Sequence, residues 1–68
     1  MKDYLEKLKD LREDRDLKQA DIAKLLGVHQ TCYSQYELGK RKIPLEEFRK
    51  LCIFYNVSAD WLLGLKSS

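Results

Sequence analysis

Two cysteines and one histidine are the first side chains of this 68-residue chain to consider as zinc ligands or as catalytic groups. Cys32, Cys52 and His29 do not form the paired ligand spacings of a zinc site. His29 has no recognisable nucleophile, base and orienting group around it, and the chain has no glycine loop to cradle a phosphate. We therefore predict no enzyme, no cofactor and no metal. Small secreted folds usually carry more cysteines, so we expect two free thiols in a reducing, cytoplasmic compartment.

Hydrogen-bonding and cationic side chains form the second group of candidates. Four uncharged polar residues stand close together and three consecutive cations follow them: Gln30, Thr31, Ser34 and Gln35, then Lys40-Arg41-Lys42. Uncharged polar groups of this kind donate and accept hydrogen bonds, whereas Lys and Arg only donate and attract anions. Taken alone, the cationic run is most simply a solvated loop, so its meaning depends on the elements around it.

These elements are predicted to be helices, because apolar residues recur at helical spacing and no stretch alternates with a period of two. Asp3 and Glu6 form a capping box at the start of a first helix, which the charged run at 13–16 ends. Four further helices are expected: Lys18–Leu26 ended by Gly27, Gln30–Leu38 ended by Gly39, Pro44–Tyr55 ended by Asn56-Val57, and a short one between Ser58 and Gly64. The prediction is a compact, all-α domain of five helices over residues 1–68, with 66–68 as a frayed tail.

Inward-facing positions follow from the same spacing. The expected core comprises Leu5, Leu8, Leu11, Leu17, Ile22, Leu25, Leu26, Val28, Tyr33, Tyr36, Phe48, Leu51, Cys52, Tyr55, Ala59, Leu62 and Leu63. Cys32 is expected to be a small filler, with no neighbouring cation that clearly activates its thiol. The apolar residues Trp61 and Leu65 either close this core or leave a patch for a second copy.

Residues 19–38 carry the most informative spacing in the chain. Ala23 lies in the middle of the second predicted helix, Gly27 lies in the turn after it, and apolar residues surround both. Two helices that cross at roughly 90–120° through a three- or four-residue turn need this arrangement. The small residue lets the helix axes approach, and the glycine relieves the turn.

With these residues the chain resembles the phage-repressor and Cro-type (XRE-like) helix-turn-helix DNA-binding family. The matching positions are Leu11-Arg12, Leu17-Lys18-Gln19, Ile22-Ala23, Leu26-Gly27-Val28, residues 33–40, Pro44, Leu51-Cys52, residues 55–58 and residues 60–64. The resemblance implies a repressor-like fold whose second helix lies across the DNA backbone and whose third enters the major groove. It also implies a sequence-specific transcriptional regulator, expected to be a repressor, from a bacterium or a phage.

The resemblance assigns DNA contacts residue by residue. Base reading falls to Gln30, Thr31 and Gln35, with Ser34 as a lesser candidate, because Gln can bond adenine bidentately and the Thr methyl can touch thymine. Phosphate contacts are expected before and after the third helix, from Lys18, Gln19, His29, Lys40, Arg41 and Lys42. For His29 simple exposure is an open alternative.

Other positions support the interface or depart from the family pattern. Arg12 and Glu37 are expected to pair through two parallel hydrogen bonds that fix the third helix, and Ala23 and Gly27 give structural support. Lys18 and His29 stand where a capping Ser, Thr or Asn is usual, so the second helix is expected to start less firmly. Leu45 replaces a cation that reaches the minor groove in some members, and no such contact is expected from it.

The net charge of +2 gains meaning from its position. Residues 17–45 carry five cations and two anions, so the excess lies in the predicted helix-turn-helix and its following loop. This distribution favours double-stranded DNA as partner, with a palindromic operator read by a homodimer. No membrane span and no small-molecule site are expected. The alternative is a protein-interaction module on the same scaffold, such as an antitoxin or antirepressor partner, using the apolar residues around Trp61 and Leu65.

Overall fold

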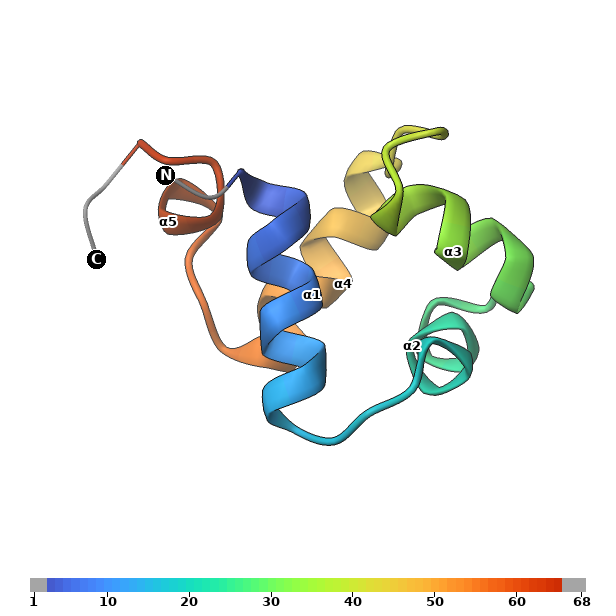
Figure 1. The fold of residues 1–68 in the computed structure, drawn as a ribbon. Helices are drawn as coiled ribbons and strands as arrows, with labels where there is room; N and C mark the ends of the chain where they lie inside the picture. The colour runs from blue at the N-terminus through green and yellow to red at the C-terminus, as the bar shows by residue number, and fades with distance from the viewer. Residues whose placement is uncertain (1–2, 66–68) are drawn as a thin grey trace.

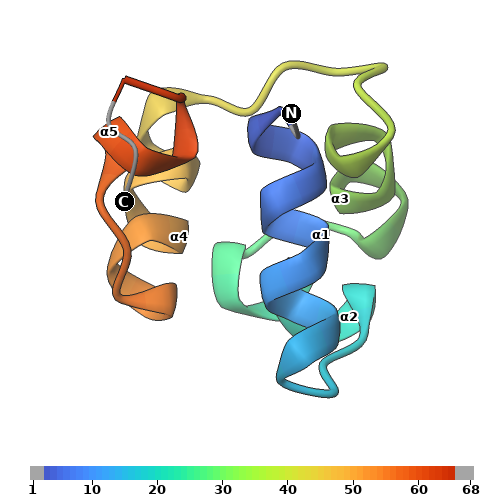
Figure 2. The same cartoon turned by 60° about the vertical axis from the view of Figure 1, so that its left-hand side comes forward.

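The computed structural model describes residues 3–65, and within them the chain forms helices and no strand. The helices are α1 (Tyr4–Asp14), α2 (Gln19–Leu26), α3 (Gln30–Glu37), α4 (Leu45–Tyr55) and α5 (Ala59–Leu62) (Figure 1). Figure 2 shows α1 between α4 and α5 on one side and α3 on the other. The all-α, five-helix prediction is confirmed, with most boundaries within one residue of those expected. The tail predicted at 66–68 lies outside the described residues.

Each described helix ends in the same way, with a residue in the left-handed conformation followed by a backbone bond that reaches back into the last turn. The five left-handed residues are Asp16, Gly27, Gly39, Asn56 and Gly64. After α2, for example, the Val28 N–H donates to the Ala23 carbonyl at 3.0 Å. This is the Schellman arrangement, which satisfies carbonyl groups that have no partner within the helix.

Helix starts are fixed by side chains at three places. The Asp3 carboxylate accepts from the Glu6 N–H at 2.9 Å, and the Ser58 hydroxyl accepts from the Trp61 N–H at 3.0 Å, as the sequence predicts. At α2 the carboxylate of Asp21 accepts from the Lys18 N–H at 2.8 Å. Asp21 thus supplies one hydrogen bond at a helix start where Lys18 itself has no side-chain acceptor.

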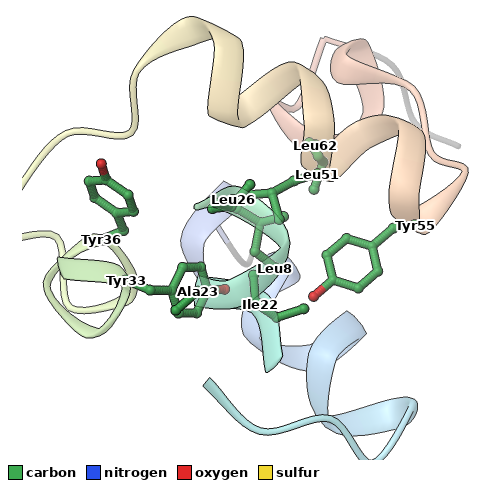
Figure 3. Close-up of a cluster of buried hydrophobic side chains, with 9 residues drawn as sticks. All are labelled: Leu8, Ile22, Ala23, Leu26, Tyr33, Tyr36, Leu51, Tyr55 and Leu62. Carbon is green, nitrogen blue, oxygen red and sulfur yellow. The ribbon is translucent and has the colours of Figure 1, made fainter. Parts of the chain in front are cut away.

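The core joins all five helices (Figure 3). Its buried members are Leu8, Ile22, Ala23, Leu26, Tyr33, Tyr36, Leu51, Tyr55 and Leu62. Two predictions of burial are wrong: Leu25 is 40% exposed and Leu63 is 50% exposed. The buried arc of α2 centres on Ala23 and Leu26, and Leu25 lies about 100° around the helix from Leu26. Leu63 is the C-cap residue of α5 and continues its right-handed backbone, so its side chain lies about 100° around the helix from the buried Leu62.

Long cationic side chains of α1 and of Arg15, the residue that follows it, tie this helix to α4 and α5. Lys7 Nζ donates to the Trp61 carbonyl at 2.7 Å and lies 4.8 Å from the centre of the Trp61 ring. Arg15 donates to the Tyr55 carbonyl at 3.3 Å, and its guanidinium lies 5.1 Å from the Tyr55 ring centre. Both cations therefore combine a hydrogen bond with a cation–π contact. These links hold α4 and α5 against α1 and leave the opposite side of the molecule to α2 and α3.

Candidate nucleic-acid interface

The α2–turn–α3 unit presents one face of α3 to solvent. Ala23 is 2% exposed and lets α3 approach α2, while Gly27 turns the chain with a φ of +73°. Tyr33 and Tyr36 anchor the inner face of α3, at 0% and 4% exposure, with their rings edge to face at 6.4 Å. Because these two positions fix the rotation of α3 about its axis, the residues on its other side must point outward.

The outward residues of α3 and its cap are polar. His29, Gln30 and Thr31 are exposed, and Ser34 and Gln35 are half-buried. The positions 30, 31, 34 and 35 fall on one side of a helix, since residues three and four apart are neighbours on its surface. The structure thus gathers the four predicted base-reading residues into one polar surface. This surface, Gln30, Thr31, Ser34 and Gln35, is called the polar face of α3 below.

The cationic loop is held at the C-terminal end of this face. The Gln35 carbonyl accepts from the backbone N–H groups of Lys40 at 2.9 Å and Arg41 at 3.3 Å. Gly39, with a φ of +76°, makes this return possible. Lys40, Arg41 and Lys42 are all exposed. The loop therefore adds positive charge next to the polar face of α3 and does not extend away from it.

Cys32 has a cationic neighbour that the sequence did not lead us to expect. Arg41 Nη1 lies 3.7 Å from Cys32 Sγ, in hydrogen-bonding geometry. The backbone bonds to Gln35 bring this cation close, because they fold the loop back over α3. Cys32 packs partly against the core, as expected for a small filler, and the described cysteines are both free thiols.

Arg12 and Glu37 meet between α1 and the end of α3. Arg12 Nε donates to Glu37 Oε2 at 2.7 Å and Arg12 Nη2 donates to Glu37 Oε1 at 3.2 Å, forming the two bonds that the sequence analysis expected. The side chains are 10% and 6% exposed, so the pair is buried. Arg12 Nη1 also donates to the Leu17 carbonyl at 2.8 Å. A buried, charge-assisted pair of this kind fixes the end of α3 on α1.

The charge state of the pair follows from these contacts. Burial is the largest single influence and raises the pKa of the Glu37 carboxyl, but the hydrogen bonds from Arg12 and Gln19 and the positive charge of Arg12 contribute to a net pKa below its ordinary value. The hydrogen bond to Glu37 raises the pKa of Arg12, against the opposing effect of burial. Each partner thus favours the charged form of the other.

The starts of α2 and α3 hold the remaining candidates for phosphate contact. Lys18 and His29 are exposed N-cap residues, and neither makes a side-chain capping bond. Gln19, the first residue of α2, is half-buried, and its Nε2 donates to Glu37 Oε1 at 3.0 Å. Sequence reasoning missed this bond. Its two residues lie far apart along the chain, and no local pattern in the sequence signals it.

Apolar side chains gather away from the polar face of α3. A shallow groove is lined by Tyr4, Ile43, Leu45, Phe48 and Leu63. Leu45 is 80% exposed and Leu65, close in sequence to Leu63, is 73% exposed, whereas Leu62 is buried and Trp61 half-buried. The C-terminal apolar residues therefore both close the core and leave apolar surface outside it.

Two other classes of site can be stated for residues 3–65. No three His, Cys, Asp or Glu side chains in this range come together in a group able to hold a metal ion. No helix in the same range has the length and apolar character needed to cross a membrane.

Comparison with known proteins adds the family and its relatives. The helix-turn-helix family model matches residues 8–62. The chain is 41% identical over 54 residues to the cryptic phage CTXphi transcriptional repressor RstR of Vibrio cholerae, covering 79% of this chain and 49% of that protein. It is 34% identical over 62 residues to the uncharacterized HTH-type transcriptional regulator YobD of Bacillus subtilis, covering 91% and 55%. It is also 34% identical over 62 residues to the HTH-type transcriptional activator BcrR of Enterococcus faecalis, covering 91% and 30%. The chain thus spans about half the length of the first two.

Proposed function

Since this chain belongs to the helix-turn-helix family, we propose that it binds double-stranded DNA sequence-specifically and regulates transcription. The observation that carries the proposal is the polar face of α3, turned outward by Tyr33 and Tyr36 and fixed at its end by the buried Arg12–Glu37 pair. A helix fits the major groove of B-DNA, where each base pair presents its own pattern of donors and acceptors. We propose repression as the direction of control, because the 41% identical relative is a transcriptional repressor. A cytoplasmic location follows from the DNA target.

Base reading is proposed for Gln30, Thr31 and Gln35, with Ser34 in a lesser role. Gln30 and Thr31 lie in the first turn of α3 and are exposed, as expected of residues that enter a groove first. Gln35 is half-buried and stands beside the cationic loop. A glutamine that bonds adenine through two hydrogen bonds contributes about 1–3 kcal/mol of discrimination against a wrong base.

Phosphate contacts are proposed on both sides of α3. On one side are Lys18, Gln19 and His29, at the starts of α2 and α3; on the other are Lys40, Arg41 and Lys42. The backbone N–H groups in the first turn of a helix favour an anion, and the exposed cations add charge. Contacts of this kind position the protein on DNA and make its affinity depend on salt.

A homodimer on a palindromic operator is proposed for the DNA-bound state. The support is the apolar surface at Leu45, Leu63 and Leu65, which is exposed in a single copy. A two-fold dimer would read two half-sites separated by one helical turn of DNA, about 34 Å.

The test is selection of bound duplexes from a random pool, followed by affinity measurements at graded salt. We expect a palindromic consensus and an affinity that falls steeply as salt rises. Gln30→Ala or Gln35→Ala should weaken binding to the selected site by about 1–3 kcal/mol and leave random DNA nearly unchanged. Equal losses on both duplexes would remove the base-reading assignment. A stoichiometric protein partner without salt-sensitive duplex binding would favour the interaction-module alternative.

A further inference from the structure

Gln19 makes a contact that its position at the start of α2 does not suggest. It is the first residue of α2, and its Nε2 donates to Oε1 of Glu37, the last residue of α3. The bond therefore spans the whole helix-turn-helix, from the first turn of one helix to the last turn of the other. The backbone turn at Gly27 joins the two helices at their other ends.

Glu37 can fix the side chain of Gln19 because two hydrogen bonds from Arg12 fix the Glu37 carboxylate. Its Oε2 accepts from Arg12 Nε at 2.7 Å, and its Oε1 accepts from both Arg12 Nη2 at 3.2 Å and Gln19 Nε2 at 3.0 Å. Arg12 also donates to the carbonyl of Leu17, in the segment that leads into α2. These bonds form one network that connects α1, the start of α2 and the end of α3. With the side chains of Arg12 and Glu37 10% and 6% exposed, water competes weakly for the bonds.

A carboxamide donates through a planar group, so one bond to Glu37 restricts the orientation of the whole Gln19 side chain. The relative placement of α2 and α3 decides which DNA phosphates the start of α2 contacts when α3 lies in the major groove. We propose, resting on the function proposed above, that Gln19 is a positioning residue. Through Glu37 it sets α3 relative to α2, so that the polar face of α3 meets the bases when α2 is seated on the phosphates.

This role differs measurably from a simple phosphate contact. Loss of a phosphate contact weakens the preferred and the random duplex alike. Misplacement of α3 lowers the affinity for the preferred duplex only, because only that complex depends on the alignment of side chains with base edges. The ratio of the two affinities therefore reports positioning.

The experiment compares three variants by affinity for the selected duplex and for a random duplex, with folding checked by circular dichroism. Gln19→Met keeps the length of the side chain and removes the donor, and Gln19→Lys restores a donor able to reach Glu37. Lys18→Met is the matched control beside them, since Lys18 makes no side-chain capping bond at the start of α2. Gln19→Met should lower the affinity ratio by roughly ten- to a hundredfold, the worth of one hydrogen bond to a charged group. Gln19→Lys should keep the ratio, and Lys18→Met should weaken both duplexes in parallel.

An affinity ratio that Gln19→Met leaves unchanged, whether or not both duplexes are weakened, would overturn the positioning role. A Gln19→Lys variant whose affinity ratio falls as far as that of Gln19→Met would overturn it too. A parent protein that binds every duplex alike would overturn the proposed function, and the positioning role would fall with it. A parent that selects its site while Gln19→Met selects equally well would overturn the positioning role alone. The two failures are therefore distinguishable in one set of measurements.

Discussion

Replacing Arg12 by methionine should destabilise the domain severely. The substitution keeps an apolar side chain of similar reach but leaves the Glu37 carboxylate, 6% exposed, without its cation. Breaking a buried ion pair by removing one partner costs about 3–5 kcal/mol, because a buried charge loses its compensation. The hydrogen bond from Arg12 to the Leu17 carbonyl is lost as well. At about 0.05–0.15 kcal/mol per residue, a domain of this size has roughly 3–10 kcal/mol of unfolding free energy, so the loss is a large share.

The measurement is urea and thermal unfolding of the parent and the variant at neutral pH, followed by circular dichroism. We expect the Tm of Arg12→Met to fall by more than about 10 °C. Arg49→Met is the matched control: its partner Glu46 lies 4.0 Å away and the two side chains are 66% and 76% exposed. That exposed pair should contribute less than about 1 kcal/mol. The double variant Arg12→Met/Glu37→Met should recover much of the loss, since an apolar pair of similar volume leaves no buried charge. A loss in Arg12→Met no larger than that in Arg49→Met would refute the reasoning.

Two further predictions concern the turn between α2 and α3 and the loss of stability at acid pH. Gly27→Ala should lower the unfolding free energy by about 1–2 kcal/mol, because a φ of +73° strains any residue that has a Cβ. The added Cβ meets no atom within 4 Å, so the cost comes from the backbone alone. A Gly27→Ala variant as stable as the parent in urea would contradict this prediction. The folded pKa of Glu37 lies below its unfolded value, so its contribution is present above the ordinary glutamate pKa and is lost as pH falls through the folded pKa. The unfolding free energy of the parent should therefore fall further between neutral and acid pH than that of Glu37→Gln, as measured by matched urea titrations. An equal fall in the two proteins would contradict this prediction.

The sequence predicted the helices well because their ends are local features. Asp3, Ser58 and Gly27 act on backbone groups within a few residues of themselves, so their chemistry can be recognised without knowing the fold. The rotation of α3 was also predictable, since Tyr33 and Tyr36 are the large apolar residues at inward spacing in that helix. For Leu25 the same kind of reasoning failed. Periodicity marks an apolar arc but not which edge of that arc a short helix buries.

The contacts that complete the candidate interface were harder to predict. The bond between Gln19 and Glu37 depends on how α2 and α3 cross, and neither residue type demands the other. The approach of Arg41 to Cys32 depends on a loop that returns over α3 through the Gln35 carbonyl. Both contacts are set by tertiary geometry and act over distances along the chain at which local patterns carry no signal.

The way in which all five described helices end has a consequence for the rate of folding. Each left-handed residue and its returning bond, such as that from the Val28 N–H to the Ala23 carbonyl, involve neighbours in the chain. Such local bonds close only short loops, and proteins dominated by short-range contacts fold in microseconds to milliseconds. The links from Lys7 to Trp61 and from Arg12 to Glu37 close much longer loops. We therefore expect the helix ends to form early and the docking of α5 and α3 onto α1 to limit the rate of folding.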